Sequence, residues 1–156
     1  MKVEVVVGSG RKVEPDSVRS LVEAVLSAEG ASGSVVVAFV DEQQMIGLNG
    51  RFRGMEGPTD VLSFRQADAE SGWPEIDERG EAELGEVVVC PEVVSRYARE
   101  ADGDREDLLG RTVLHGVLHL LGYDHEQDQG EMRAREEALA QELRPKISAI
   151  SLEMEG

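Results

Sequence analysis

The sequence predicts an α+β fold in which helices pack on a small mixed β-sheet of about four strands. Two observations lead to this fold class: a few short apolar or alternating segments have the length of strands, and several longer segments carry apolar residues at helical spacing. A third observation is the length of 156 residues, which suits one domain with a buried core. We therefore expect a single domain over residues 1–156.

The first part of the chain is predicted to contain a strand over 2–7, a helix over 15–29, a strand over 34–40, a short helix over 41–48 and a strand over 61–64. The first strand alternates polar and β-branched residues, and the second is a nearly continuous apolar run, as in buried strands. Pro15 opens the first helix and Gly30 ends it. Asp41 caps the second helix, which Asn49 and Gly50 are expected to end.

The second part is predicted to contain a surface loop over 66–83, a strand over 85–90 and helices over 91–100, 105–121 and 128–143. The loop is polar, acidic and rich in turn formers. Trp73 within it is expected to pack the loop down, with a stacking platform for a base as the alternative. Pro91 opens a helix, and Cys90 before it is expected to be a buried thiol, with a role as a fourth metal ligand as the alternative.

The composition points to a protein of the reducing cytosol. No apolar run approaches the length of about 20 residues that spans a bilayer, so we expect no membrane partner. The N-terminal residues are charged and lack the apolar block of a signal peptide. The single cysteine cannot form an internal disulfide, which favours a cytoplasmic location.

Charge is distributed unevenly along the chain. The formal net charge of −16 lowers the expectation of a polyanionic partner. Residues 67–86 hold eight acids and one arginine, whereas residues 50–66 hold Arg51, Arg53 and Arg65 against two acids. Because salt screens charges beyond roughly 10 Å, this local arginine cluster can bind phosphate on an acidic protein. Arg51 and Arg65 are accordingly predicted to bind substrate.

All three histidines fall within one segment, in the spacing H-x-x-x-H-x-x-G-x-x-H. His115 and His119 lie one helical turn apart on one face, and Gly122 can end the helix so that the chain turns back and delivers His125. Three imidazoles that converge on one point form a metal site with open coordination positions, as catalytic zinc sites have. We predict one zinc ion on His115, His119 and His125.

The residue after the first histidine separates this site from the zinc peptidases. Those enzymes carry a glutamate there as general base, whereas this chain has Gly116. Two interpretations of Gly116 are open: it lets another backbone pack close to the helix, or it leaves room for a bulky substrate beside the metal. The sequence identifies no general base.

Three blocks of the sequence are informative together: the histidine segment 115–125, the pair L-N-G-R-F-R (48–53) and P-T-D-V-L-S-F (58–64), and the strand segment L-G-E-V-V-V (84–89). Together they resemble the YbeY family of bacterial metal-dependent endoribonucleases. Their order and spacing match over essentially the whole chain. Three positions depart from the family pattern: Glu86 stands in place of Asp, residues 54–57 lack a Lys-Asp pair, and Arg65 stands in place of Pro, where it compensates in part for the absent lysine.

The resemblance implies a zincin-like fold, with zinc on the three histidines and an endoribonuclease activity. It further implies a role in 3′-end maturation of 16S ribosomal RNA and in ribosome quality control, with ribosomal RNA and the small ribosomal subunit as partners. By position, Arg53 matches an arginine that is functional in the family. We therefore assign catalytic roles to Arg53, His115 and His119 in a metal-dependent hydrolase domain.

Two other functions remain open at this stage. The first is a metallopeptidase, which Gly116 disfavours. The second is a non-enzymatic factor bound to the ribosome, whose metal only stabilises the helix-turn that carries His125. A casein or peptide-library assay tests the first. Chelation tests the second, because a structural metal contributes to folding stability whereas a catalytic one need not.

Overall fold

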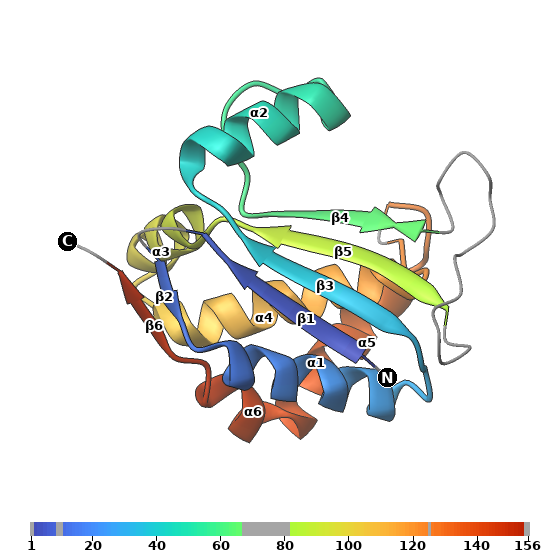
Figure 1. The fold of residues 1–156 in the computed structure, drawn as a ribbon. Coiled ribbons are helices and arrows are strands. Elements are labelled where there is room, and N and C mark those ends of the chain that lie inside the picture. Colours follow the sequence, from blue (N-terminus) through green and yellow to red (C-terminus); the bar gives the residue numbers. More distant parts are fainter. Residues whose placement is uncertain (1, 9–10, 67–81, 125, 155–156) are drawn as a thin grey trace.

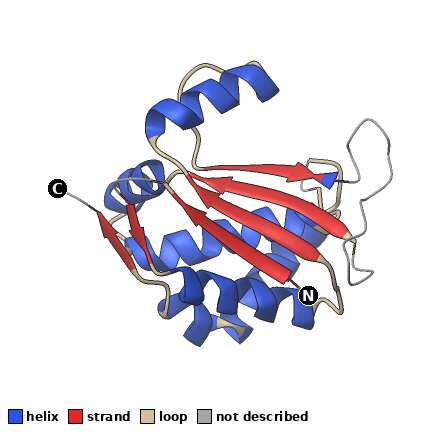
Figure 2. Ribbon diagram, in the orientation of Figure 1, coloured by secondary structure: helices blue, strands red, loops and turns tan. Residues whose placement is uncertain are grey.

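The computed structural model describes residues 2–8, 11–66, 82–124 and 126–154. Its helices are α1 (Pro15–Ala28), α2 (Glu42–Arg53), α3 (Pro91–Glu100), α4 (Arg105–Leu120), α5 (Glu131–Glu142) and α6 (Arg144–Ser148). Its strands are β1 (Lys2–Val7), β2 (Arg11–Val13), β3 (Ser34–Phe39), β4 (Val61–Arg65), β5 (Glu83–Val89) and β6 (Leu152–Met154). The predicted α+β class is confirmed (Figure 2). No helix in the described ranges has the length and apolarity that a membrane span requires.

A mixed sheet of four strands in the order β1-β3-β5-β4 forms the centre of the fold (Figure 1). β1, β3 and β5 are parallel, whereas β4 runs antiparallel to β5 at one edge. Helix α1 packs against β1, and α4 packs against β4 and β5. The edge strand β4 therefore lies beside the helix that carries His115 and His119.

The two faces of the sheet bury separate apolar clusters. The larger cluster joins α1, α4, α5 and α6 to one face of the sheet, and its strand members include Val37, Val87 and Val89. Because side chains alternate along a strand, Val88 points to the other face. There it packs in a second cluster with Met45 of α2 and with Cys90, whose thiol is fully buried. This burial agrees with the expectation of a structural thiol.

Helix α2 extends further than predicted. We expected it to end at Asn49 and Gly50, but it continues to Arg53 and is capped by Gly54 with a φ of 64°. The Asn49 side chain is buried and donates from Nδ2 to the Gly57 carbonyl at 2.9 Å, so it does not break the helix. Arg51 and Arg53 thus lie on the last helical turn, where positive charge is favourable.

Three elements were not predicted, and several boundaries differ. β2 and β6 form a separate two-stranded antiparallel sheet, and α6 begins directly after α5 where Pro145 was expected to follow a terminal helix. α5 begins at Glu131 instead of Asp128. Asp128 lies before the helix, and its carboxylate accepts hydrogen bonds from the Gly130 and Met132 amides. β5 begins at Glu83, inside the predicted loop 66–83. Residues 67–81 of that loop, including Trp73, lie outside the described residues.

Gly116 is required by close packing between α4 and the sheet. A Cβ atom at this position would lie 2.5 Å from Val87 Cγ1 and 3.3 Å from both Ser63 Oγ and Val61 Cγ2. The Ser63 hydroxyl also donates to the Gly116 carbonyl at 3.0 Å. The structure therefore supports the first interpretation of Gly116, in which the missing side chain lets helix and sheet approach.

This packing predicts opposite effects for two glycine substitutions. Gly116→Ala should lower the free energy of unfolding by about 1–3 kcal/mol, because the new methyl group overpacks the core. Gly47→Ala, on the exposed side of α2 with no atom within 4 Å of the new Cβ, should raise it by about 0.5–1 kcal/mol. Urea denaturation measures both. Equal effects of the two changes would contradict the close-packing role of Gly116.

Candidate metal centre and active-site cavity

The imidazoles of His115 and His119 converge on one point. Their Nε2 atoms lie 3.2 Å apart and their ring planes are inclined by 79°. Two nitrogen ligands of a tetrahedral zinc ion, each about 2.0–2.1 Å from the metal, are separated by roughly 3.3–3.4 Å. The observed separation therefore fits two ligands of one ion.

Each of these rings also has an oxygen atom beside its other nitrogen. His115 Nδ1 lies 2.5 Å from Glu136 Oε1, and His119 Nδ1 lies 3.0 Å from the Tyr123 carbonyl oxygen. A backbone carbonyl only accepts, so His119 must donate from Nδ1. With Glu136 Oε1 as the acceptor, His115 takes the same arrangement. In these tautomers Nε2 keeps its lone pair, which is the state that binds a metal.

The predicted third ligand cannot be placed. His125 lies outside the described residues. Within the ranges that the structure does describe, no group of three His, Cys, Asp or Glu side chains is arranged to hold a metal ion. The zinc site on His115, His119 and His125 thus stays a prediction, supported by the geometry of two of its three members.

The turn after α4 is held by several contacts that position His119. Gly122 adopts a φ of 102°, and the Tyr123 amide donates back to the Leu118 carbonyl at 3.2 Å. The Tyr123 hydroxyl donates to Glu29 Oε2 at 2.9 Å, and Arg135 also pairs with Glu29. Burial of the phenol, together with the hydrogen bond to Glu29, raises the pKa of Tyr123, so the hydroxyl stays protonated. Tyr123, whose carbonyl orients His119, is therefore held through both its backbone amide and its side chain.

A cavity of about 750 Å³ opens at the two histidines. Its walls come from the end of α2, the segment 59–65 around β4, and the turn after α4. The lining residues are Phe52, Arg53, Thr59, Asp60, Val61, Leu62, Ser63, Phe64, Arg65, His115, His119, Gly122, Tyr123, Asp124, Glu126 and Gln127. The cavity thus brings Arg53 and Arg65 to the same space as the two histidines, from segments about 50 to 60 residues away in the sequence.

The three arginines predicted to form one cluster have different surroundings. Arg53 lines the cavity, and no residue in the described ranges forms an ion pair with it. Arg51 is not a lining residue. It lies two residues before Arg53, so its side chain points in a direction that differs by roughly 200° around the helix axis. Its guanidinium carbon lies 5.6 Å from the centre of the Phe52 ring.

Arg65 supports the end of α4 from inside the cavity wall. Its Nε donates to the Leu120 carbonyl at 3.3 Å, which satisfies one of the terminal carbonyl groups of the helix. A Cβ atom at Gly122 would lie 3.1 Å from Arg65 Nη2, so the guanidinium also packs over the turn. The substrate-binding roles of Arg51 and Arg65 stay predictions, and the structure adds a helix-capping contact for Arg65.

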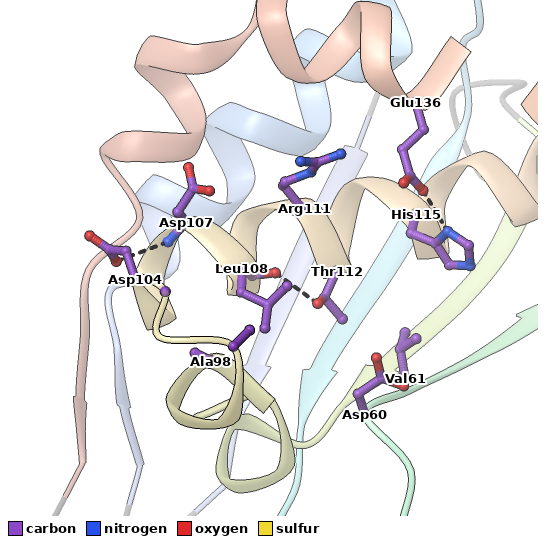
Figure 3. Close-up of a pocket in the computed structure, with 12 residues that line it drawn as sticks. Asp60, Val61, Ala98, Asp104, Asp107, Leu108, Arg111, Thr112, His115 and Glu136 are labelled. Carbon is purple, nitrogen blue, oxygen red and sulfur yellow. Dashed lines mark hydrogen bonds and ion pairs between the residues drawn. The ribbon is translucent and has the colours of Figure 1, made fainter. Parts of the chain in front are cut away.

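A second, smaller cavity meets the first one at His115. It has a volume of about 460 Å³ and lies between α3, α4 and α5 (Figure 3). Asp60, Val61 and His115 line both cavities. The close-up shows Glu136 reaching from α5 to the His115 ring, while Arg111 and Asp107 lie further along α4. His115 is therefore accessible from two sides, and Glu136 contacts it on the side of the smaller cavity.

Glu136 was missed by sequence reasoning, and it predicts a measurable effect on metal binding. Removal of a carboxylate that orients a ligand imidazole typically costs 10- to 100-fold in metal affinity, and we expect about this loss for Glu136→Ala. Glu136→Gln, which keeps an acceptor oxygen, should lose less. Zinc affinity is measured by competition with a chromogenic chelator.

The neighbouring residue on α5 provides a matched control. Glu137 pairs with Arg111 on the surface, and among the described residues it forms no hydrogen bond or ion pair with a histidine. Glu137→Ala should therefore leave zinc affinity unchanged. Equal affinities for Glu136→Ala and Glu137→Ala would show that the contact with His115 has no role in metal binding.

Comparison with known proteins gives concordant matches. The model of the family described as "Endoribonuclease YbeY" matches residues 8–144. A Roseiflexus sp. protein of that description is 37% identical over 146 residues, which cover 90% of this chain and 91% of that protein. A Frankia alni protein of the same description is 46% identical over 97 residues, and the match spans 61% of this chain and about half, 54%, of that relative.

A solved structure extends the similarity to the fold. The solution structure of TM1509 from Thermotoga maritima is 30% identical in sequence and superimposes with a TM-score of 0.59. The match covers 96% of each chain. The four-stranded sheet and its helices are therefore an arrangement that this chain shares with a solved protein.

Proposed function

This chain belongs to the endoribonuclease YbeY family, and from that premise we propose that it is a zinc-dependent endoribonuclease that cleaves single-stranded RNA. The names of its curated relatives support the nuclease activity. One structural observation carries the proposal furthest: His115 and His119, whose Nε2 atoms lie 3.2 Å apart, line the same cavity as Arg53. Its proposed biological role is 3′-end maturation of 16S ribosomal RNA and ribosome quality control, on the small ribosomal subunit in the cytoplasm.

The residues of the cavity have different roles in the proposed hydrolysis of a phosphodiester. A zinc ion held by His115, His119 and His125 would supply a Lewis acid for a phosphoryl oxygen and an activated water. Glu136 and the Tyr123 carbonyl orient the rings of His115 and His119 for that ion. The planar guanidinium of Arg53 binds two phosphate oxygens and stabilises the negative charge that develops on them.

The acidity of the chain is compatible with an RNA substrate when charge is considered locally. The formal net charge is −16, but interactions between exposed charges decay over roughly 10 Å at physiological salt. Arg53 and Arg65 lie in the wall of the cavity, within the segment 50–66 that carries a small positive excess. Asp60, Asp124 and Glu126 line the same cavity, so a phosphate there would depend on direct contact with the arginines and not on a net positive charge of the wall.

The packing at Gly116 argues against the peptidase alternative. Zinc peptidases place their general base on the residue after the first histidine. In this chain any side chain at that position meets Val87 at 2.5 Å from its Cβ, so a glutamate there requires the sheet to shift. Position 116 thus lacks the peptidase base, and its packing against the sheet leaves no space for that side chain.

The test compares zinc-loaded and chelator-treated protein on matched RNA and protein substrates. We expect cleavage of a single-stranded ribosomal RNA fragment by the zinc-loaded protein only, weaker cleavage of the same sequence as a duplex, and no cleavage of casein. In cells that lack the protein, RNA profiling should show unprocessed 3′ ends of 16S ribosomal RNA. Cleavage of casein, or RNA cleavage that survives complete removal of metal, would contradict the proposal.

A further inference from the structure

Phe52 is an exposed aromatic residue on a helix face that is otherwise buried. Met45 and Asn49 lie on the inward face of α2 and are buried, with Asn49 only 4% exposed. Phe52 follows Met45 by seven residues, so the two side chains point in nearly the same direction from the helix. Phe52 is nevertheless 56% exposed. The inward face of α2 therefore continues past the core and ends at the mouth of the cavity, which Phe52 lines.

The Phe52 ring is held in place by its neighbours. Phe64 of β4 contacts it in an edge-to-face arrangement, with the ring centres 5.1 Å apart and the planes inclined by 72°. The Arg51 guanidinium lies over the ring at 5.6 Å. An aromatic ring fixed in this way offers a surface for stacking with little loss of conformational freedom on binding.

Charge and position distinguish Phe52 from the other exposed apolar residues near α2. Ile46 is 44% exposed and lies about 100° away from the inward face, and Met55 after the helix is 54% exposed, but neither of them lines the cavity. Phe52 lies between two arginines in sequence, and one of them, Arg53, shares its cavity with His115 and His119. An aromatic ring beside cations is the combination that single-stranded nucleic acids bind, through base stacking and phosphate contacts.

We propose that Phe52 is a stacking platform for one base of the RNA strand whose phosphate contacts Arg53. This inference rests on the proposed function and deepens it, because it names the element of the cavity that requires an unpaired base. A base within a duplex is stacked on both sides and cannot cover the ring. Phe52 would thereby favour single-stranded substrates without reading their sequence.

The experiment measures binding of zinc-loaded protein to a short fluorescent single-stranded RNA by anisotropy, read within the time in which a gel shows that the RNA is not yet cleaved. Loss of one base–aromatic stack should weaken binding of Phe52→Leu by about 5- to 100-fold. Phe52→Trp should restore binding. Ile46→Ala, which removes an exposed apolar side chain from the same helix, should bind like the unchanged protein.

A series of RNAs with one abasic position provides the decisive comparison. At the position that stacks on Phe52, removal of the base should weaken binding of the RNA to the unchanged protein. The same abasic RNA and the complete RNA should bind Phe52→Leu with equal affinity. Equal binding of Phe52→Leu and unchanged protein, or a Phe52→Leu defect that persists on every abasic RNA, would overturn the platform. So would a Phe52→Leu defect confined to association with ribosomal proteins. If the unchanged protein neither binds nor cleaves RNA, the proposed function itself fails.

Discussion

Replacement of Arg53 by alanine is expected to lower the rate constant of RNA cleavage by about 10²–10³, the usual effect of removing one donor that stabilises transition-state charge. The side chain projects from the last turn of α2 into the cavity that holds His115 and His119. Among the described residues no hydrogen bond or ion pair joins it to either histidine, so zinc content and the melting temperature should stay unchanged. Single-turnover cleavage with saturating enzyme measures the effect without a contribution from product release.

Arg51→Ala is the matched control for this substitution. It removes the same charge from the same helical turn, but its side chain lies outside the cavity lining. We expect the Arg51→Ala change to weaken RNA binding modestly through the loss of charge and the loosening of Phe52, with little effect on the cleavage step. Arg53→Lys should recover only part of the rate, because an ammonium group lacks the planar pair of donors. Equal losses for Arg51→Ala and Arg53→Ala would reduce Arg53 to a general electrostatic role.

The predictions that depended on local periodicity agree best with the structure. The helix predicted from Pro15 and the helix predicted from Arg105 both form, because their apolar residues lie at helical spacing and are buried. The error at the end of α2 arises from tertiary context. Asn49 is a helix-ending residue when its side chain is solvated, but here it is buried against the loop that follows and donates to Gly57.

The unpredicted elements are short and depend on distant partners. β2 and β6 have three residues each and pair across most of the chain, as Val13 with Leu152. Segments of this length have no periodicity to detect, and their hydrogen-bond partners cannot be read from the neighbouring sequence. α6, with five residues, is equally short, and its buried Ile147 packs against Gly110 of α4.

In the candidate site, the sequence pattern predicted the two histidines that lie one turn apart on α4. It did not predict the groups that orient their rings. The i, i+4 spacing of His115 and His119 predicted convergent rings, as the structure has them. Glu136 lies 21 residues after His115 on a different helix, and the oxygen that orients His119 belongs to the backbone. Backbone carbonyls have no sequence signature, and a glutamate on an acidic helix does not stand out from its neighbours.

The loss of either helical histidine is expected to remove the metal and, with it, RNA cleavage. The Nε2 atoms of His115 and His119 lie 3.2 Å apart, so in the proposed site each would supply one of the few bonds to the ion. His115→Ala also leaves Glu136 without its imidazole partner, and His119→Ala leaves the Tyr123 carbonyl without a donor. We expect less than one zinc ion per chain in both variants after dialysis, measured by elemental analysis, and cleavage at the level of the chelator-treated protein.

Arg111→Ala controls for the effects of any substitution on α4. Arg111 lies one turn before His115 and pairs with Glu137 near the surface, so its removal should cost less than about 1 kcal/mol and leave the zinc content at one ion per chain. The melting temperatures then separate the two roles of the metal. If zinc is catalytic, the melting temperatures of the histidine variants should be close to that of the Arg111→Ala variant. If zinc is structural, their melting temperatures should be far lower, and chelation should lower the melting temperature of the unchanged protein by a similar amount. Full zinc occupancy in His115→Ala and His119→Ala would contradict the proposed metal centre, because the zinc would then be bound without these two rings.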